Sequence, residues 1–274
     1  MIRLIASDID GTLLPYGETA MPQRLFPLIH RLRDRGILFA PASGRQYHSL
    51  RTLFAPVADE ACFLCENGAV LYGPGTEEGA PLLSKTPLPR QEALELAHTI
   101  LGLSGCDVVI EGQTVNYVCG GSPAFLRQLT KGHGNLVQTV DQPEDISEDI
   151  VKIAAFCPTG FDEPVKILGP RWGERFHMAV AGLGWLDFTL ATKGSGLSEL
   201  CAGLGLSLSE TAVFGDNWND QSMLHAAGRA YLMEAADPAL RQALTRSRAD
   251  EGRDAPRVCQ NVCDELEAIL QCGP

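Results

Sequence analysis

Asp8 and Asp10 stand two residues apart at the end of a short apolar segment near the N-terminus, in the string SDIDGTLL. The segment Arg3–Ser7 has the character of a short buried strand, along which side chains alternate in direction, so both carboxylates should point the same way. Two like charges this close are unfavourable unless a cation or a shared proton lies between them, and Mg²⁺ prefers such oxygen ligands. Gly11 would let the backbone turn sharply, and Thr12 adds a hydroxyl. The string predicts a ligand site, with a solvated turn as the alternative.

Strand and helix patterns alternate in the first third of the chain and again after about residue 193. The other expected strands are Ile37–Ala42, Cys62–Cys65, Thr211–Phe214 and Arg229–Leu232. The expected helices are Pro22–Arg35, Ser49–Phe54, Gly196–Leu204, Gln221–Ala227 and Val262–Leu270. Strands separated by helices predict an α/β fold, a doubly wound parallel sheet with helices on its faces. Such sheets bind ligands beyond the carboxyl ends of their strands, where Asp8 and Asp10 are expected.

The sequence between about residues 83 and 187 has a different pattern and predicts a second α/β unit. A turn or surface loop rich in Gly and Pro, at residues 73–81, precedes this unit. Its expected elements are the helices Arg90–Leu101 and Pro123–Leu129 and the strands Cys106–Ile110, Thr114–Val118, Val151–Cys157 and Phe176–Val180. We therefore predict a Rossmann-like core formed by residues 1–82 and 188–274, interrupted by an inserted α/β domain of residues 83–187.

Groups suited to phosphate lie at two further boundaries of the expected core elements. Ser43, Gly44 and Arg45 follow the second strand, where a hydroxyl and free backbone N–H groups can bind phosphate oxygens. Lys193 precedes a helix, and its ammonium could bridge an attacking carboxylate and a phosphoryl oxygen. Alone, the first motif is an ordinary turn and the second a surface lysine. Their order behind the paired aspartates favours the functional interpretation.

Two more aspartates follow the strand Thr211–Phe214, in the string GDNWND. Asp216 falls at the end of the strand and Asp220 about one helical turn later, so both can face one centre. They would add acidic groups to a cation already held at Asp8 and Asp10. The alternative is an Asx-rich turn that caps a helix.

Taken in order, these motifs resemble those of haloacid dehalogenase-like hydrolases, specifically the Cof-type phosphatases that carry a large α/β cap. The matching strings are DIDGTLL at residues 8–14, SGR at 43–45, KG at 193–194 and GDNWND at 215–220. The string ENGA at residues 66–69 also resembles a strand-end motif of the family. The resemblance spans the whole core and places the cap between the second and third motifs.

The resemblance implies a role for each matching residue. Asp8 would be the nucleophile that forms an aspartyl-phosphate, and Asp10 would be the general acid and base. Mg²⁺ would be bound by the Asp8 carboxylate, the Asp10 backbone carbonyl and Asp216. Asp220 would support the metal shell or the catalytic Lys193. The residues that would hold the phosphoryl group or line the entrance are Thr12, Ser43, Gly44, Arg45, Asn67, Lys193 and Asn219.

The chain departs from the family pattern at a few positions. Ser43 stands where Thr is more usual, which keeps the hydroxyl. Glu234, Ala235 and Ala236 follow Met233 where the family more often has Gly, Asn and Ala, and residues 251–253 only loosely match an acidic-Asp-Gly-Val segment. These differences affect the rim of the site and the fit of the substrate. Five cap residues could contact the leaving group or be ordinary surface residues: Glu111, Arg171, Trp172, Arg175 and His177.

Composition limits the partners and the compartment. The net charge of −12 argues against nucleic acid and anionic membranes, because both select basic patches. No apolar stretch reaches the roughly 18 residues of a membrane span, and we expect no signal peptide. Nine scattered cysteines do not predict a disulfide framework, and Cys62 and Cys65 are expected to be buried thiols. We therefore expect a cytoplasmic protein with no obligate protein partner.

The expected function is magnesium-dependent hydrolysis of small phosphomonoesters, such as sugar phosphates, through phosphorylated Asp8. One alternative is a phosphosugar mutase that uses the same aspartyl-phosphate, and release of free phosphate would separate it from a hydrolase. The other is a non-catalytic protein that binds phosphometabolites on this fold. Asp8, Asp10, Lys193 and Asp216 are all present, which favours a catalyst. The substrate and the oligomeric state are not evident from the sequence.

Overall fold

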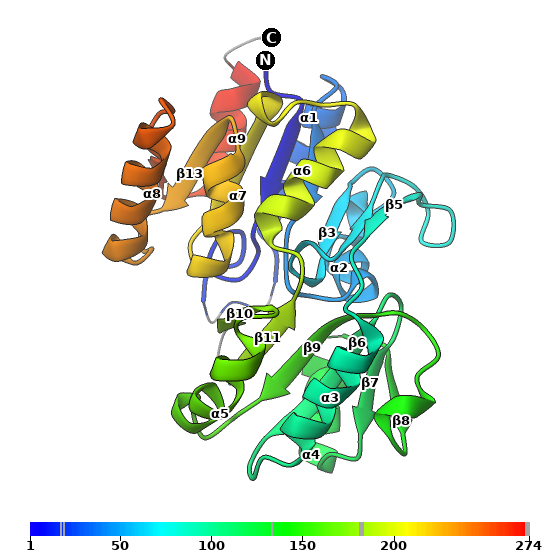
Figure 1. Cartoon of the computed structure of the whole chain (residues 1–274). Helices are drawn as coiled ribbons and strands as arrows, with labels where there is room; N and C mark the ends of the chain where they lie inside the picture. Colours follow the sequence, from blue (N-terminus) through cyan, green and yellow to red (C-terminus); the bar gives the residue numbers. More distant parts are fainter. Residues whose placement is uncertain (17, 19, 133, 181–183, 272–274) are drawn as a thin grey trace.

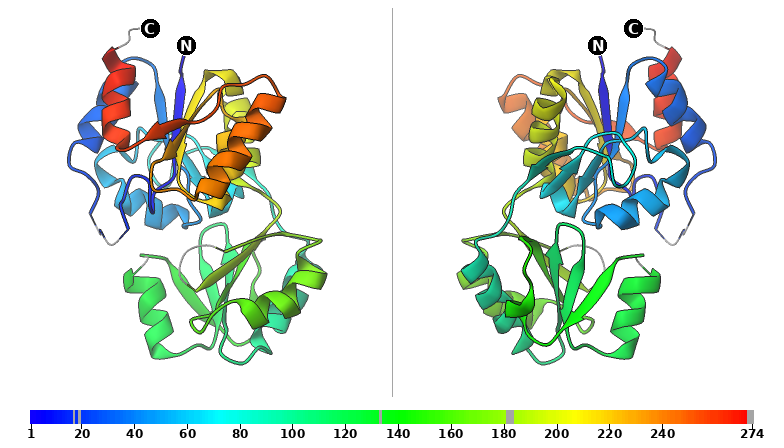
Figure 2. Two further views of the ribbon diagram at one scale, coloured as in Figure 1. Left: turned by 90° about the vertical axis from the view of Figure 1, so that its left-hand side faces the viewer. Right: turned by 90° about the vertical axis from the view of Figure 1, so that its right-hand side faces the viewer.

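The computed structural model describes residues 1–16, 18, 20–132, 134–180 and 184–271, and these form two lobes. The core lobe contains both termini, and the cap lobe lies at the opposite end of the molecule (Figures 1 and 2). The chain passes from the core to the cap and back once, because the cap is an insertion. The α/β core with an inserted cap, expected from the sequence, is confirmed.

A five-stranded parallel sheet forms the centre of the core, in the order β14-β13-β12-β1-β2. Its strands are β1 (Leu4–Ser7), β2 (Leu38–Pro41), β12 (Thr211–Gly215), β13 (Arg229–Met233) and β14 (Arg257–Cys259). Ser7 at the end of β1 lies opposite Pro41 of β2 and Phe214 of β12. The segments that follow these three strands therefore meet at one edge of the sheet.

Helices cover both faces of this sheet because its strands alternate between two hydrophobic clusters. Ile5 packs with residues of α1 (Leu25–Arg33), α2 (Tyr47–Leu53) and α9 (Val262–Gln271). Leu4 and Ala6 pack on the other face, with residues of α6 (Lys193–Leu204), α7 (Gln221–Ala226) and α8 (Pro238–Asp250). Both faces of β1 are thus buried, so the strand that leads directly to Asp8 is packed on both sides.

The predicted strand at Cys62–Cys65 belongs to a different sheet from the one expected. β3 (Phe63–Cys65) pairs antiparallel with β4 (Val70–Tyr72), which pairs with β5 (Leu82–Lys85). A turn with positive φ at Glu66, Asn67 and Gly68 reverses the chain directly after β3, so the strand pairs with β4 in a hairpin. A single bridge between Ala42 and Leu64 still connects the two sheets.

The cap is built on a six-stranded sheet in the order β10-β11-β9-β6-β7-β8, in which only β7 and β8 are parallel. Its strands are β6 (Asp107–Gly112), β7 (Asn116–Cys119), β8 (Val137–Val140), β9 (Ile150–Phe156), β10 (His177–Val180) and β11 (Trp185–Thr189). α3 (Arg90–Leu101) and α5 (Asp162–Trp172) pack on one face, and α4 (Pro123–Arg127) packs on the other. The divisions placed after residues 82 and 187 remain predictions, and they fall within β5 and β11.

The cap and the core are joined by polar contacts as well as by the connecting segments. Gln46, almost fully buried, donates from Nε2 to the carbonyl oxygen of Thr114 (2.9 Å), and its Oε1 accepts from the N–H of Leu136 (2.8 Å). Lys152 of the cap donates to the carbonyl oxygen of Gly44 in the core (2.6 Å). The cap is therefore fixed directly to the loop that follows β2.

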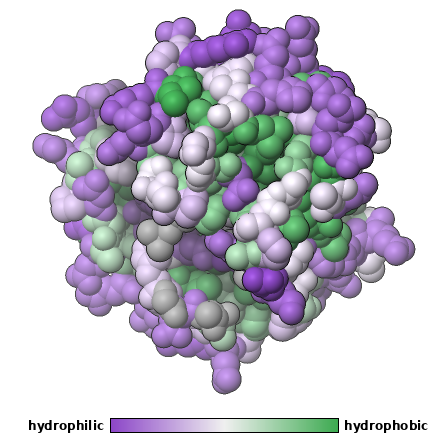
Figure 3. All heavy atoms as spheres, turned by 90° about the horizontal axis from the view of Figure 1, so that it is seen from below, coloured by the Kyte–Doolittle hydropathy of each residue, from purple (hydrophilic) through white to green (hydrophobic). Residues whose placement is uncertain are grey.

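The surface and the cysteines give little further indication of partners. Viewed from the cap end, hydrophobic residues form patches between hydrophilic ones (Figure 3). None of the described helices is long and apolar enough to cross a membrane. The eight described cysteines are free, and Cys62 and Cys65 are buried as expected.

Candidate active site

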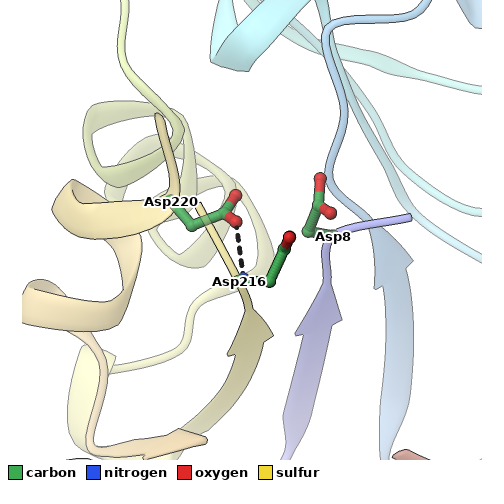
Figure 4. Close-up of side chains that lie close together, drawn as sticks. All are labelled: Asp8, Asp216 and Asp220. Carbon is green, nitrogen blue, oxygen red and sulfur yellow. Dashed lines mark hydrogen bonds between the residues drawn. The ribbon is translucent and has the colours of Figure 1, made fainter. Parts of the chain in front are cut away.

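Three aspartates meet at the carboxyl end of the core sheet. Asp8 follows β1, Asp216 follows β12, and Asp220 lies in the short 3₁₀ turn Trp218–Asp220. One carboxylate oxygen from each lies within 4.8 Å of the others. Figure 4 shows the side chains of Asp8 and Asp216 projecting from neighbouring strand ends, with Asp220 approaching from the helical side. All three are buried.

Lys193 connects two of these aspartates. It is the first residue of α6, whose N-terminus is capped by the Thr192 hydroxyl. The fully buried Nζ of Lys193 lies 2.6 Å from Asp8 Oδ1 and 2.6 Å from Asp220 Oδ1. The other oxygen of Asp220 accepts hydrogen bonds from the backbone N–H groups of Asp216 (3.0 Å) and Asn217 (3.1 Å). Asp220 is thus occupied in positioning its neighbours, whereas Asp8 has one oxygen left for other partners.

Burial of these carboxyl groups makes their ionised forms less favourable. Desolvation raises the pKa of Asp8 well above its ordinary value, the Asp220 carboxylate raises it further, and Lys193 opposes the shift. The pKa of Asp216 is also raised, again by burial and by Asp220. In Lys193 the two carboxylates outweigh the effect of burial and raise the pKa of the ammonium. Lys193 alone therefore does not balance the negative charge, and a cation would lower the pKa of both aspartates.

The carboxylate of Asp216 is held in a position that suits the binding of a hard divalent cation. Thr12 Oγ1 donates to one carboxylate oxygen of Asp216 (3.1 Å), and the Tyr16 hydroxyl donates to the other (2.9 Å). Gly11 has a φ of 94°, and a Cβ added there would lie 2.2 Å from Asp216 Oδ2. Glycine thus allows the loop after β1 to approach Asp216 closely. Asp8, Asp216 and Asp220 bring carboxylate oxygens within 4.8 Å of one another, and Mg²⁺ prefers such oxygen ligands, so the residues fit this ion.

Asp10 lies at the wall of the cavity and is more exposed than Asp8. Arg45 binds its carboxylate with two hydrogen bonds, from Nη2 to Oδ1 (2.8 Å) and from Nε to Oδ2 (3.2 Å). Both aspartates line the same cavity, which agrees with the alternation expected from the sequence. The pair with Arg45 fixes the direction of the Asp10 carboxylate.

A cavity of about 690 Å³ connects this cluster to the cap. Eight of the residues expected at the site line it: Asp8, Asp10, Ser43, Gly44, Arg45, Asn67, Asp216 and Asn219. Three others, Thr12, Lys193 and Asp220, do not line the cavity but contact Asp8 or Asp216 from behind. Thr12 was expected to bind phosphate or substrate, and its hydroxyl is instead used on Asp216.

Comparison with known proteins shows the family of this chain. A sequence model of the haloacid dehalogenase-like hydrolases matches residues 5–251. The chain belongs to this family.

Curated relatives and solved structures support the same assignment. The chain is 26% identical to 5-amino-6-(5-phospho-D-ribitylamino)uracil phosphatase YbjI of Escherichia coli, covering 98% of this chain and 97% of that protein. It is 29% identical to an HMP-PP phosphatase of Citrobacter koseri, covering 88% and 87%. A sugar phosphatase of subclass IIB of the superfamily has the same fold, with a TM-score of 0.73, 20% identity and coverage of 98% and 97%. The expectation of a Cof-type phosphatase is confirmed at the level of the family.

Several residues of the cavity in this hydrolase were not recognised in the sequence. Tyr16 lies just beyond the first motif, without a pattern that marks it. Lys152 and Asp187 are single charged residues within apolar strands, which was the available signal. The remaining unpredicted lining residues are Gln46, Asn116, Gln128, Leu129, Asn135, Trp185 and Asn217.

Of the five cap residues considered as contacts of the leaving group, only one lines the cavity. Glu111 lines the cavity. Trp172 is buried in the cap core, and Arg171 and Arg175 pair with glutamates of α3 at the surface. His177 is exposed and does not line the cavity. The atypical residues 234–236 do not line it either.

Proposed function

We propose that this protein is a magnesium-dependent phosphomonoester hydrolase that acts through a phosphorylated Asp8. The observation that carries the proposal is the position of Asp8, which faces a cavity, contacts Lys193 and lies beside Asp216. The substrates we propose are sugar phosphates or similar small phosphorylated metabolites. The names of the matched relatives support this class, because they describe phosphatases of small phosphorylated molecules. We further propose that the protein acts in the cytoplasm without an obligate partner.

Asp8 is the nucleophile in this mechanism. Lys193 holds Oδ1, so Oδ2 can attack the phosphorus atom of a phosphate placed in the cavity. The bond between phosphorus and the ester oxygen breaks, and an aspartyl-phosphate forms. Ser43 lies beside the same cavity, and its hydroxyl is a donor for a phosphoryl oxygen.

Asp10 is the general acid and base. Its carboxyl group gives a proton to the leaving oxygen and then takes one from the water that attacks the aspartyl-phosphate. The pair with Arg45 keeps the carboxyl group directed into the cavity in both steps. Inorganic phosphate and free Asp8 are the result.

The residues that would hold Mg²⁺ are Asp8 and Asp216, through their carboxylates, and Asp10, through its backbone carbonyl. The bound ion would neutralise negative charge on the phosphoryl oxygens. Thr12, Tyr16 and Asp220 fix Asp216 in place for this role.

The test is a screen for free phosphate released from a panel of phosphomonoesters. Wild-type protein is assayed with Mg²⁺ and with the ion removed by a chelator, and Asp8→Asn is assayed beside it. We expect release that requires both Mg²⁺ and Asp8. Release that persists in Asp8→Asn would contradict the mechanism, and isomerisation of the substrate without release of phosphate would indicate a mutase instead.

A further inference from the structure

The cavity has two chemically different ends, and the inference drawn from this difference rests on the function proposed above. Asp8 and Asp216 mark the core end, where the phosphate would be bound. The cap supplies the other end, where the leaving group would lie. Its lining residues are Glu111, Asn116, Gln128, Leu129, Asn135, Lys152, Trp185 and Asp187.

Lys152 is a cation of the cap end, but its ammonium is already occupied. It is only 4% exposed, and its Nζ lies 2.6 Å from the Gly44 carbonyl oxygen, 2.7 Å from Glu66 Oε2 and 3.0 Å from Glu111 Oε2. The contact with Gly44 is a hydrogen bond, and the two glutamates lie at ion-pair distance, so carboxylates already surround this ammonium. Asp187 Oδ2 adds a third carboxyl group at 3.6 Å. We call Lys152, Glu66, Glu111 and Asp187 the Lys152 cluster.

The strand register of the cap builds this cluster. Glu111 of β6 lies directly opposite Lys152 of β9. Asp187 of β11 lies opposite Ala154, two residues from Lys152, so its side chain is on the same face of the sheet. With one ammonium and three carboxyl groups, the cluster presents no net positive charge to the cavity.

Arg45 is the other cation that lines the cavity, among the residues that the structure describes. Both of its hydrogen bonds to Asp10 are charge-assisted and parallel. Arg45 and Asp10 thus form an ion pair in which the carboxylate balances the charge of the guanidinium. Both lining cations are therefore paired with carboxyl groups, and neither offers an uncompensated positive charge to a second negative charge near the cap.

The hydrogen-bonding groups of the cap end favour a ligand that donates. Glu111 and Asp187 present carboxyl groups. Asn67 donates from Nδ2 to Asp187 (2.9 Å), which fixes the orientation of its amide, while its buried Oδ1 has no partner among the described residues. Leu129 and the ring of Trp185 supply an apolar wall for C–H groups. Hydroxyl or N–H groups on a small carbon frame match this lining.

We propose that the Lys152 cluster is a charge-exclusion device at the cap end of the cavity. It selects leaving groups that are rich in hydroxyl or N–H groups and carry no second negative charge. The cap end thus accepts the phosphate esters of sugars and alditols, and it rejects esters of sugar acids and bisphosphates. Glu111 and Asp187 are specificity-determining residues in this account.

A matched pair of substrates tests the selection. Sorbitol 6-phosphate and 6-phosphogluconate have the same chain length and differ at the terminal carbon, which is an alcohol in one and a carboxylate in the other. The full-length protein is assayed with each in the presence of Mg²⁺. Because the carboxyl groups of the cluster would repel a terminal carboxylate, we expect kcat/KM to be about tenfold or more higher for the alditol ester.

A second comparison supplies the free cation that the cavity lacks. Gln128 lines the cap end and is half-buried, so Gln128→Lys adds an ammonium there, and Gln128→Met is the neutral control of similar size. The alditol preference should fall about fivefold or more in Gln128→Lys and stay unchanged in Gln128→Met. Thermal unfolding of both variants checks that they are folded.

The outcomes separate this inference from the proposed function. If no ester in the panel releases phosphate with Mg²⁺, the proposed function fails. If phosphate is released but 6-phosphogluconate is hydrolysed as well as sorbitol 6-phosphate, only the charge exclusion is wrong. An alditol preference that Gln128→Lys does not reduce would also overturn it, because the selection would then not depend on charge.

Discussion

Two buried lysines, Lys193 and Lys152, each lie among carboxyl groups, yet they serve opposite ends of one cavity. Lys193 belongs to the core and contacts Asp8 and Asp220, both at 2.6 Å. Lys152 belongs to the cap and contacts Glu66 of the core as well as Glu111 of the cap. The first lysine leaves one oxygen of the nucleophile free for chemistry. The second is paired with carboxyl groups of both lobes. Buried ion pairs thus position a reactive group at one end of the cavity and, in our proposal, exclude negative charge at the other.

The contrast between the two lysine sites predicts that the largest loss of activity follows a substitution of Asp8. Asp8→Asn should reduce phosphate release by roughly 10⁴-fold or more, because the amide cannot form the phosphoenzyme. The amide oxygen can still accept from Lys193, so thermal unfolding should change little. Asp250→Asn is the matched control at an exposed position of the core, and it should retain full activity. Unfolding of Asp8→Asn at assay temperature would leave its activity uninformative about chemistry but would contradict the expected stability.

Asp10→Asn should have the next largest effect. Loss of the general acid and base should slow phosphoryl transfer and hydrolysis by about 10²- to 10⁴-fold. Arg45 keeps an oxygen to bind, so the fold should be retained. Rapid-quench assays measure both steps. A variant in which neither step is slowed would show that Asp10 is not the proton carrier.

Lys152→Met tests whether the cap cluster is a structural ion-pair site. Removing the ammonium leaves three buried carboxyl groups near one another, which should reduce the free energy of unfolding by about 3–5 kcal/mol at pH 8. The loss should be smaller at pH 5, because protonated carboxyl groups repel each other less. Urea unfolding measures the difference, and Lys166→Met is the control at an exposed ion pair of the cap. Equal stability of the two variants would contradict the role given to Lys152.

Glu111→Gln should have the smallest effect on stability, and the size of this effect depends on pH. Burial and the neighbouring Glu66 raise the pKa of Glu111 well above its ordinary value in the folded state. The stability contributed by this carboxyl group is therefore full below the unfolded-state pKa, about 4.3, and is lost as pH rises through the folded-state pKa. Gln imitates the protonated form, so the variant should gain about 1–2 kcal/mol relative to wild type between pH 5 and pH 8.

Denaturant unfolding at these two pH values measures the effect of Glu111→Gln. Glu174→Gln makes the same change at an exposed cap glutamate outside the cavity, and it controls for the removal of one negative charge. A relative stability of Glu111→Gln that falls with increasing pH would show that Glu111 is ionised and stabilised by Lys152.

Much of the core site could be predicted from the sequence because its chemistry lies at the ends of short apolar strands. Asp8, Ser43 and Asp216 each follow a strand of one parallel sheet, and the topology brings those ends together. The Lys152 cluster could not be predicted in this way. It depends on the register between β6 and β9 and on docking of the cap against Gly44, both of which are long-range properties.

Three of the elements that the sequence did not reveal lack a clear local signal. α8 is a polar helix, whose buried face consists mainly of Leu240 and Leu244, so it lacks a broad apolar stripe. α5 contains Pro170 and Gly169, which disfavour a helix interior. β14 is only three residues long. Tertiary packing, not local preference, determines all three.

The central claim is that Asp8 becomes phosphorylated, and trapping the intermediate tests it most directly. The Asp10→Asn variant would be quenched in acid during turnover of a hydrolysed substrate with Mg²⁺, digested with trypsin and analysed by mass spectrometry. Trypsin releases residues 4–24, which contain Asp8 and Asp10. We predict one added phosphate on this peptide, located at Asp8 by fragmentation and absent when Mg²⁺ is removed. Turnover with no phosphorylated intermediate, or with the phosphate on another residue, would contradict the mechanism.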